Sequence, residues 1–189
     1  EKMFIPLGMK NTGFHDNRLR IIQNRAMAYK PDAESGFLLD WYLNFDWVGS
    51  GGLLTTVEDL LLWDQNFYID RLGGGKFVEQ MLERGTLNNG DKLDYAFGLF
   101  HGQYKGLPTV HHGGAFMGFR AELLRFPTQH LSTTVLCNVS NAQSRRLAED
   151  VAVVFLGDAV KSVPINTVKV ERQENTRSAI HQPDSALEK

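Results

Sequence analysis

The stretch from Val110 to Phe119 reads V-H-H-G-G-A-F-M-G-F, and the rest of the chain is organised around it. Two adjacent histidines and three glycines lie between two runs that have the composition of β-strands. Glycine lets a backbone approach a ligand where a Cβ would collide, and histidine titrates near neutral pH. The stretch therefore predicts a reaction cleft at the mouth of a strand. A glycine-rich hairpin with two surface histidines would show the same pattern.

Four consecutive strands are predicted around this stretch. Residues Phe119 to Phe126 alternate as a half-buried strand does, and the alternation stops at Pro127. Three further strand-like runs are Tyr95 to Gln103, Leu107 to His111 and Leu131 to Asn138. Because short turns separate the runs, an antiparallel meander is expected. Cys137 lies in the last run and is expected to be a buried thiol.

Two helices are predicted before the strands. Thr55-x-x-Glu58 has the form of a capping box, in which a hydroxyl and a carboxylate satisfy free backbone N–H groups. An apolar stripe at spacings of three and four follows, so a helix is expected from Thr56 to about Ile69. A shorter helix with the same spacing is expected from Phe77 to Leu82.

One helix is predicted after the strands and one before all other elements. Asn141 is expected to cap the later helix, which ends near Gly157. Its apolar face is expected to contain Leu147, Val151, Val154 and Phe155. At the start of the chain, Glu1 to Ile5 is expected to be a last helical turn, because Pro6 disfavours helix at the residue before it.

The segment between the first helical turn and the helix from Thr56 has weaker signals of secondary structure. Arg25 to Tyr29 is a candidate short strand, and Lys30 to Ser35 is expected to end it. The aromatic-rich run from Phe37 to Val48 has no clean period. Such a run could line a cleft, but it is expected to pack in a core under a long loop.

The composition, with 42% hydrophobic and 22% charged residues, is typical of a globular domain. A net charge of -2 with scattered Lys and Arg predicts no nucleic-acid partner. No apolar run reaches the roughly 20 residues of a membrane span. A single cysteine allows no internal disulfide and no cysteine metal cluster. Residues 1–161 are expected to form the folded part, and the polar residues 162–189 a linker or tail.

Four motifs follow one another along the chain. They are I-P-L-G-M-K-N-T (Ile5 to Thr12), G-S-G-G-L-L-T-T-V-E-D-L (Gly49 to Leu60), Y-A-F-G-L (Tyr95 to Leu99) and H-G-G-A-F-M-G-F (His112 to Phe119). In this order they resemble the second half of the serine β-lactamase and penicillin-binding-protein family, in particular its class C β-lactamase and esterase branch. The last motif resembles the third active-site motif of that family. The resemblance implies an α+β fold with an antiparallel sheet flanked by helices.

The resemblance also implies a mechanism. In this family a serine attacks the carbonyl of an amide, lactam or ester, and a lysine three residues on and a tyrosine activate it. By resemblance, the backbone N–H of Ala115 stabilises the oxyanion, and His112 assists the tyrosine or binds an anionic group of the substrate. Gly113 and Gly114 are expected to keep the strand edge bare, and Phe116 to contact the substrate. No metal and no cofactor are implied.

The sequence departs from the family in lacking its nucleophile. No Ser-x-x-Lys and no Tyr-Ser-Asn or Tyr-Ala-Asn occurs in the 189 residues. These groups are expected upstream of Glu1, so the chain is expected to be an inactive fragment whose partner is the N-terminal half of its own domain. A lone second half would expose a sheet edge or face.

The resemblance gives only broad expectations about substrate and location. The substrate is expected to be a small molecule or a peptide, with β-lactam, D-amino-acid peptide, ester and lactone all open. His rather than Lys at position 112 favours an esterase or a peptidase. The family also implies a periplasmic or extracellular location.

Two other classes of function fit parts of the sequence. A zinc hydrolase could use His101, His111 and His112, but adjacent strand residues point to opposite faces and no His-x-x-x-His occurs. A binding or scaffold homologue, which keeps the fold without the serine motif, also fits. The sequence upstream would distinguish this last class from an enzyme.

Overall fold

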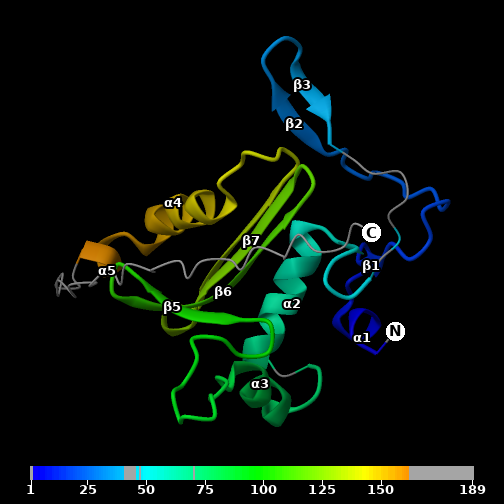
Figure 1. Ribbon diagram of the computed structural model, residues 1–189. Helices are drawn as coiled ribbons and strands as arrows, with labels where there is room; N and C mark the ends of the chain where they lie inside the picture. Colours follow the sequence, from blue (N-terminus) through cyan, green and yellow to red (C-terminus); the bar gives the residue numbers. More distant parts are fainter. Residues whose placement is uncertain (1, 41–45, 47, 70, 162–189) are drawn as a thin grey trace, which may run out of the picture.

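The structure is a computed structural model, and it describes the whole chain except residues 1, 41–45, 47, 70 and 162–189. At its centre is a four-stranded antiparallel sheet whose spatial order equals the chain order (Figure 1). The strands are β5 (Phe100–Tyr104), β6 (Leu107–Phe116), β7 (Phe119–Phe126) and β8 (Leu131–Cys137). The predicted α+β class and the antiparallel meander are therefore confirmed.

Helices lie on both faces of this sheet (Figure 1). The helices are α1 (Phe4–Leu7), α2 (Val57–Ile69), α3 (Gly75–Leu82), α4 (Ser144–Leu156) and α5 (Asp158–Lys161). Smaller elements are the pairs β1 (Gly13–Phe14) with β4 (Leu53–Leu54) and β2 (Tyr29–Asp32) with β3 (Gly36–Leu39), and the 3-10 turn η1 (Pro127–Gln129). None of the helices in the described ranges is long and apolar enough to cross a membrane.

The strand before the glycines is shorter than predicted. The expected strand from Tyr95 to Gln103 begins only at Phe100. Gly98 has a φ of 74°, a conformation that favours glycine, and it turns the chain. The N–H of Ala96 then donates to the carbonyl of Leu99 at 2.8 Å and closes a small loop.

The strand that contains the glycines is longer than predicted. The expected strand from Leu107 to His111 continues to Phe116 and pairs with β7 along its second half. Gly113 and Gly114 therefore lie inside a strand and not at its mouth. The turn to β7 is made by residues 117–118.

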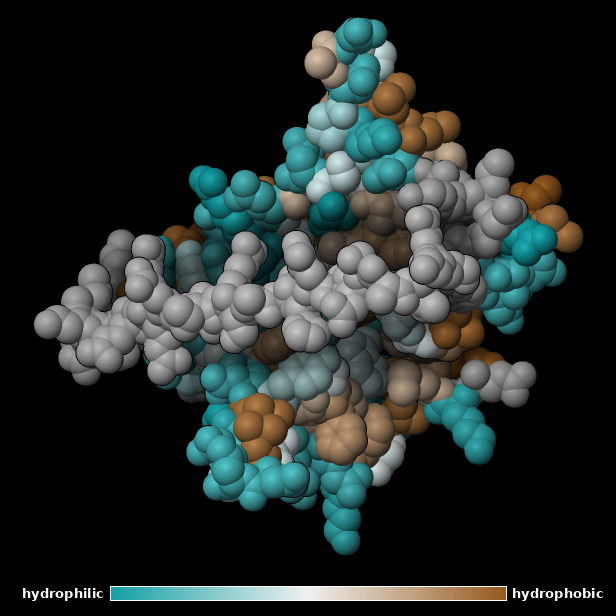
Figure 2. Space-filling model, in the orientation of Figure 1, coloured by the Kyte–Doolittle hydropathy of each residue, from teal (hydrophilic) through white to brown (hydrophobic). Residues whose placement is uncertain are grey.

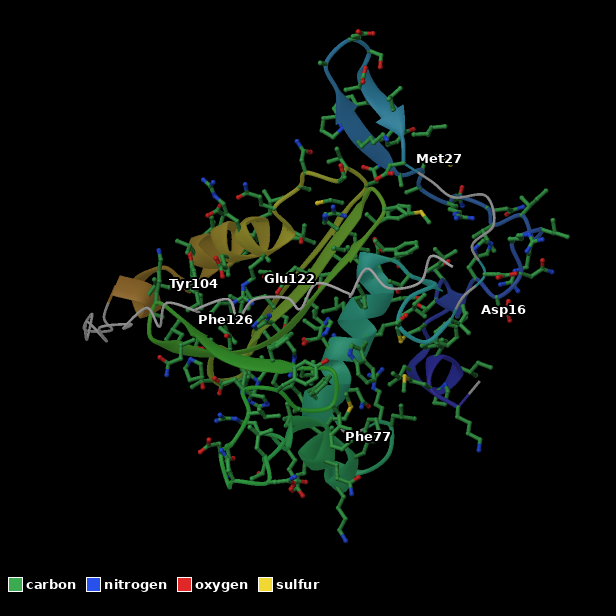
Figure 3. All side chains as sticks on the ribbon, in the orientation of Figure 1. Asp16, Met27, Phe77, Tyr104, Glu122 and Phe126 are labelled. Carbon is green, nitrogen blue, oxygen red and sulfur yellow. The ribbon has the colours of Figure 1, made fainter. Side chains whose placement is uncertain are left out.

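The apolar core lies between the sheet and α4. It contains Leu107, Leu124, Phe126, Ala148, Ala152 and Leu156. Figure 3 labels Phe126 and Tyr104, which packs against this core, near the end of the sheet beside α5. The two alanines are one helical turn apart, so the backbone of α4 can approach the sheet closely.

The predicted apolar face of the last helix was wrong. Its four large residues are all exposed, Val154 by 77% and Phe155 by 72%. The buried residues are Ser144, Ala148, Ala152 and Leu156, which repeat every four positions on another face. Both stripes have a helical period, and the sequence pattern favoured the larger side chains. The helix also begins at Ser144, without a side-chain cap, and not at Asn141.

The helix α2 buries polar residues. Asp59, Asp64 and Asn66 are its buried residues, whereas Val57 and Leu61 of the predicted apolar stripe are exposed. The predicted stripe was therefore wrong in part, because hydrogen-bonded polar groups take up the buried face. The cap also lies one residue later than predicted.

The cap of α2 is Thr56. The backbone N–H of Asp59 donates to Oγ1 of Thr56 at 3.3 Å, and the helix begins at Val57. The predicted capping box placed this role on Thr55, whose hydroxyl instead lies 2.8 Å from the hydroxyl of Thr12.

The hairpin of β2 and β3 projects away from the sheet (Figure 1). The predicted strand from Arg25 to Tyr29, ending at Lys30, was wrong, because the strand runs from Tyr29 to Asp32. It ends there because Oδ2 of Asp32 accepts bonds of 2.7 Å from the N–H and the hydroxyl of Ser35, which close the hairpin turn. Phe37, Leu38 and Leu39 are exposed on β3 and do not lie in a core. Figure 2 shows apolar surface along this hairpin. Residues 41–45 and 47 of the aromatic run lie outside the described residues.

Two smaller predictions also need correction. The first helix extends to Leu7 and includes Pro6, because the first N–H groups of a helix need no partner within it. It ends at Gly8, whose φ of 77° is typical of a helix C-terminus. Cys137 is half-buried and is not a core thiol. The predicted tail, residues 162–189, lies outside the described residues.

Candidate active site

The outer edge of β6 is only half covered. β5 pairs with β6 from Leu107 to His111 and goes no further. From His112 to Phe116, β6 pairs with β7 on one side and with no strand of the described residues on the other. We call this segment the open edge of β6. The outward backbone groups of His112 to Ala115 therefore have no strand partner among the described residues, and an unpaired strand edge can bind an added strand.

His112 lies at the start of the open edge and has two aromatic neighbours. Its Nε2 lies 3.5 Å from the phenol oxygen of Tyr95. Its ring stacks on Phe100, with centroids 5.7 Å apart and planes inclined by 27°. The sequence pattern identified the motif that contains Tyr95 but not its contact with His112.

The two adjacent histidines face opposite sides of the sheet. Paired residues of antiparallel strands share a face, and His111 pairs with Leu124, which lies in the core under α4. His112 pairs with Leu123 on the other face, where α2 lies. The register therefore separates the two side chains as predicted, while the role of His112 toward a substrate stays a prediction.

The two glycines have different surroundings. A Cβ on Gly113 would lie 2.6 Å from Oε2 of Glu122, so the carboxylate occupies the space behind this residue. A Cβ on Gly114 would lie at an ordinary 3.5 Å from Cβ of Ala121. A side chain at position 113 would therefore require the carboxylate of Glu122 to shift, whereas Gly114, which is exposed, suits the predicted bare edge.

The turn after the open edge is fixed by the hairpin behind it. A Cβ on Gly118 would collide with the backbone of Tyr29. Tyr29 is itself anchored, because its N–H donates to the carbonyl of Asn138 at 2.9 Å and its carbonyl accepts from the N–H of Ser140 at 2.9 Å. Gly118 thus allows the root of the β2–β3 hairpin to pack against the turn.

One buried carboxylate joins two of the motifs. Oδ2 of Asp59 accepts a bond of 2.8 Å from the N–H of Asn11 and one of 2.7 Å from the hydroxyl of Thr12. The hydroxyls of Thr12 and Thr55 lie 2.8 Å apart. The motifs from Ile5 and from Gly49 therefore fasten the first loop to the start of α2. Their role in the described structure is to fix the fold.

The histidines proposed for a zinc site do not form one in the described residues. The register puts His111 and His112 on opposite faces of the sheet, although both rings stack on Phe100, with centroids 5.5 Å and 5.7 Å from it. Burial lowers the pKa of His101, with Arg84 adding to the effect. In the described part of the chain, no group of three or more His, Cys, Asp or Glu side chains is placed to hold a metal ion.

Residues 1–156 match the family model described as Beta-lactamase. The chain belongs to the serine β-lactamase and penicillin-binding-protein family. It is 24% identical over 189 residues to a protein named D-aminopeptidase from Brucella ovis, covering 99% of this chain and 35% of that protein. It is 26% identical over 153 residues to a D-aminopeptidase from Gluconobacter oxydans, covering 81% of this chain and 29% of that protein.

Two solved structures share the fold. One is an octameric penicillin-binding protein homologue from Pyrococcus abyssi, with a TM-score of 0.70 and 22% identity over 82% of this chain and 36% of that one. The other is a penicillin-binding protein from Bacillus halodurans, with a TM-score of 0.66 and 17% identity over 82% of this chain and 47% of that one. The chain spans about a third of the length of the curated relatives, 35% for the protein from Brucella ovis.

Proposed function

We propose that this chain is the C-terminal part of the catalytic domain of a serine hydrolase, which cleaves amide, lactam or ester bonds through an acyl-enzyme. The serine, its lysine and the tyrosine would come from the preceding half of the domain. This chain would supply the N–H of Ala115 as an oxyanion donor. His112 would assist proton transfer or bind an anionic group of the substrate.

The observation that supports this proposal most is the open edge of β6. β5 begins at Phe100, opposite His111, so the segment that contains His112 and Ala115 is left without an outer strand among the described residues. An extended substrate can bind such an edge as an added strand. Gly114 and Ala115 are exposed there, and Phe116 offers an apolar surface beside them.

Among the possible substrates we place peptides with D-amino acids first. The curated relatives that align with 99% or 81% of this chain are named D-aminopeptidase. A histidine in place of lysine at position 112 also favoured a peptidase or an esterase over a dedicated β-lactamase. The location outside the cytoplasm remains a proposal that rests on the family alone.

Exposed apolar surface supports a partnership with an N-terminal half. Beside β8 and α4 lies an apolar groove of about 370 Å³, lined by Leu131, Ser132, Thr133, Thr134, Val135, Val151 and Phe155. Val151 and Phe155, from the exposed stripe of α4, form one wall of the groove. β8 is the last strand of the sheet, and the described residues place no further strand beside it. Contiguous exposed apolar surface of this kind usually marks an interaction site.

The experiment compares the chain alone with the intact protein in which the N-terminal half precedes it. Residues 1–189 should neither hydrolyse a D-alanine anilide, a chromogenic β-lactam or an ester nor react with a fluorescent fluorophosphonate. The intact protein should hydrolyse the D-alanine anilide faster than its L isomer and should be labelled on the upstream serine.

Each outcome decides a different part of the proposal. Stoichiometric labelling of residues 1–189 would show that the nucleophile lies in this chain and would overturn the assignment. An intact protein that binds penicillin but turns over none of the substrates would instead favour a binding or scaffold role. Turnover of the L isomer alone would remove the proposed substrate class but keep the hydrolase.

A further inference from the structure

A charged cluster lies directly behind the open edge, between the sheet and α4. The carboxylate of Glu122 is buried, with 5% of the side chain exposed. Its Oε1 lies 3.1 Å from Nδ1 of His111 on β6 and 3.2 Å from Nη1 of Arg145 on α4. Figure 3 labels Glu122 at β7, beside α4. One carboxylate on β7 thus contacts a residue of β6 and a residue of α4.

The cluster is unusual for the face on which it lies. The neighbouring residues on this face of β7, Leu124 and Phe126, are fully buried and apolar. A buried carboxylate is costly unless it is paired, and the hydrogen bond that Arg145 donates to Oε1 supplies the compensation. The contact with His111 is an ion-pair distance and lacks the geometry of a hydrogen bond. An apolar residue would fill this place at lower cost, so a carboxylate here calls for another reason.

The shape of β6 at this point depends on the carboxylate. Glu122 pairs with Gly113 across the two strands. A Cβ added at position 113 would lie only 2.6 Å from Oε2 of Glu122. Gly113 is the residue between His112 and Gly114 on the open edge. The carboxylate of Glu122 therefore packs against the backbone of β6 between His112 and Ala115, the two residues with predicted roles in the site.

We propose that Glu122 is a positioning residue of the site. It fixes the backbone of β6 against β7 and α4, and it thereby sets the direction of the His112 side chain and of the Ala115 N–H. This inference rests on the proposed function, since it concerns how that site is held in geometry. Glu122 itself lies on the far face of the sheet and does not meet the substrate.

The first test is Glu122→Gln in the intact protein. The variant keeps the size of the side chain and removes the negative charge that pairs with Arg145 and lies beside His111. We expect kcat to fall roughly 10- to 100-fold with KM nearly unchanged, because a small misplacement of a catalytic group slows the chemical step. Amide hydrogen exchange in the peptide that covers residues 110–116 should become faster, and this measurement does not depend on activity.

The second test uses the collision between the two residues. Gly113→Ala should lower kcat strongly, because the new Cβ meets Oε2 of Glu122. In the double variant Gly113→Ala/Glu122→Ala the collision is gone, so kcat should return to the value of Glu122→Ala alone. A merely structural role of Gly113, such as backbone freedom, would leave the double variant as slow as Gly113→Ala.

A third variant covers the case in which Glu122 variants do not fold. His111→Gln breaks the link to β6 and leaves the contact of Glu122 with Arg145 in place; it should lower kcat about 3- to 10-fold. The matched control is Glu149→Gln, because Glu149 accepts a 2.6 Å bond from the same Arg145 but does not contact β6. That control should keep the kcat of the parent.

The outcomes separate this inference from the proposed function. If the intact parent protein has no activity, the proposed function fails, and the exchange measurement still reports whether Glu122 fixes β6. If the parent is active and the folded Glu122 and His111 variants have its kcat and its exchange rates, Glu122 is not a positioning residue. Equal damage from Gly113→Ala with and without Glu122 would also overturn the inference.

Discussion

The two faces of the central sheet are covered in different ways. On one face α4 packs through Ala148 and Ala152 against the apolar residues Leu124 and Phe126. On the other face α2 is joined to the sheet by an ion pair between Asp64 and Arg125, and both side chains are buried. Apolar contacts have no preferred direction, whereas a charged pair fixes one side chain against one other. The α2 side is also the face of His112.

The buried arginine on the α2 side has aromatic neighbours as well. Its guanidinium lies 3.9 Å from the ring centroid of Phe67 and 5.0 Å from that of Tyr68. Burial raises the pKa of Tyr68, so this phenol is neutral beside the charged pair. Rings on α2 and a charge on β7 therefore fix the position of α2. We expect this polar joint to be more sensitive to single substitutions than the apolar α4 side.

The largest loss of stability is expected for Arg125→Ala. This change leaves the carboxylate of Asp64 buried without its partner and should lower the free energy of unfolding by about 3–5 kcal/mol. Denaturation by urea, followed by circular dichroism, measures it on residues 1–189. The double variant Arg125→Met/Asp64→Leu should recover most of the loss, because an apolar pair of similar volume carries no buried charge.

A surface pair supplies the control for this prediction. Nε of Arg146 lies 3.7 Å from the carboxylate of Asp150, and both side chains are exposed. Arg146→Ala should change the free energy of unfolding by about 1 kcal/mol at most. Equal losses for Arg125→Ala and Arg146→Ala would show that α2 does not depend on the buried pair.

The next prediction concerns the two histidines, which lie on the two faces of the sheet. In the intact protein His112→Ala should lower kcat/KM by roughly 10²-fold or more, the range for a positioned acid or base. His111→Ala should have a smaller effect, because His111 acts only through Glu122. Kinetics on variants with matched melting temperatures decide it. A damaging His111→Ala with a fully active His112→Ala would place the site on the α4 face.

The backbone of the open edge gives a prediction that does not involve a side chain. Ala115→Ser should be tolerated, because the proposed contribution of this residue is its N–H. Ala115→Pro removes that donor and should lower kcat about 10²- to 10³-fold, provided that the melting temperature is unchanged. Full activity of a folded Ala115→Pro variant would exclude the proposed oxyanion donor.

On the apolar side we expect a moderate effect from added volume. Ala152→Leu inserts a larger side chain where α4 meets the sheet and should cost about 1–3 kcal/mol of stability. Val154→Leu, a change on the exposed stripe, should alter the free energy of unfolding by less than about 0.5 kcal/mol. Thermal melts of the two variants test whether the small or the large residues of α4 form the packed face.

The sequence predicted the elements better than their faces. Strand β7 has the predicted bounds, and the order and direction of the strands follow from short turns between apolar runs. The buried face of α4 was missed because Ala148 and Ala152 are weak signals beside large apolar residues. The open edge was missed because it depends on where β5 begins relative to β6, a matter of pairing and not of composition.

The charged groups could be recognised only in part. Glu122 interrupts an apolar alternation, but its place behind Gly113 follows from the register, which fixes Glu122 opposite that glycine. The pair of Asp64 and Arg125 joins residues 61 positions apart, and no local pattern reports such a contact. Residue roles toward a substrate were carried by the family resemblance and stay predictions.

The smallest expected effect comes from a buried histidine in the region of α2 and the small sheets. His15 is buried beside β1, and its backbone N–H donates to the carbonyl of Gly52 at 2.8 Å. Burial lowers the pKa of His15 from its ordinary value of 6.5, and the nearby Arg25 and Arg20 add to the effect. The acidic neighbours Asp16 and Asp46 act in the opposite direction.

The sign of the resulting pH dependence follows from proton binding. As the pH falls below 6.5, the unfolded chain protonates His15 while the folded protein keeps it neutral, so the free energy of the unfolded state falls relative to that of the folded one. The contribution to stability is therefore full above 6.5 and is lost as the pH falls from 6.5 to the lower folded pKa. Urea titrations between about pH 5 and pH 7 should show stability decreasing on acidification, and His15→Gln should reduce the slope. His101, whose pKa burial also lowers, contributes with the same sign, so some slope should remain in that variant. An unchanged slope in His15→Gln would show that this histidine does not couple the stability of the α2 region to pH.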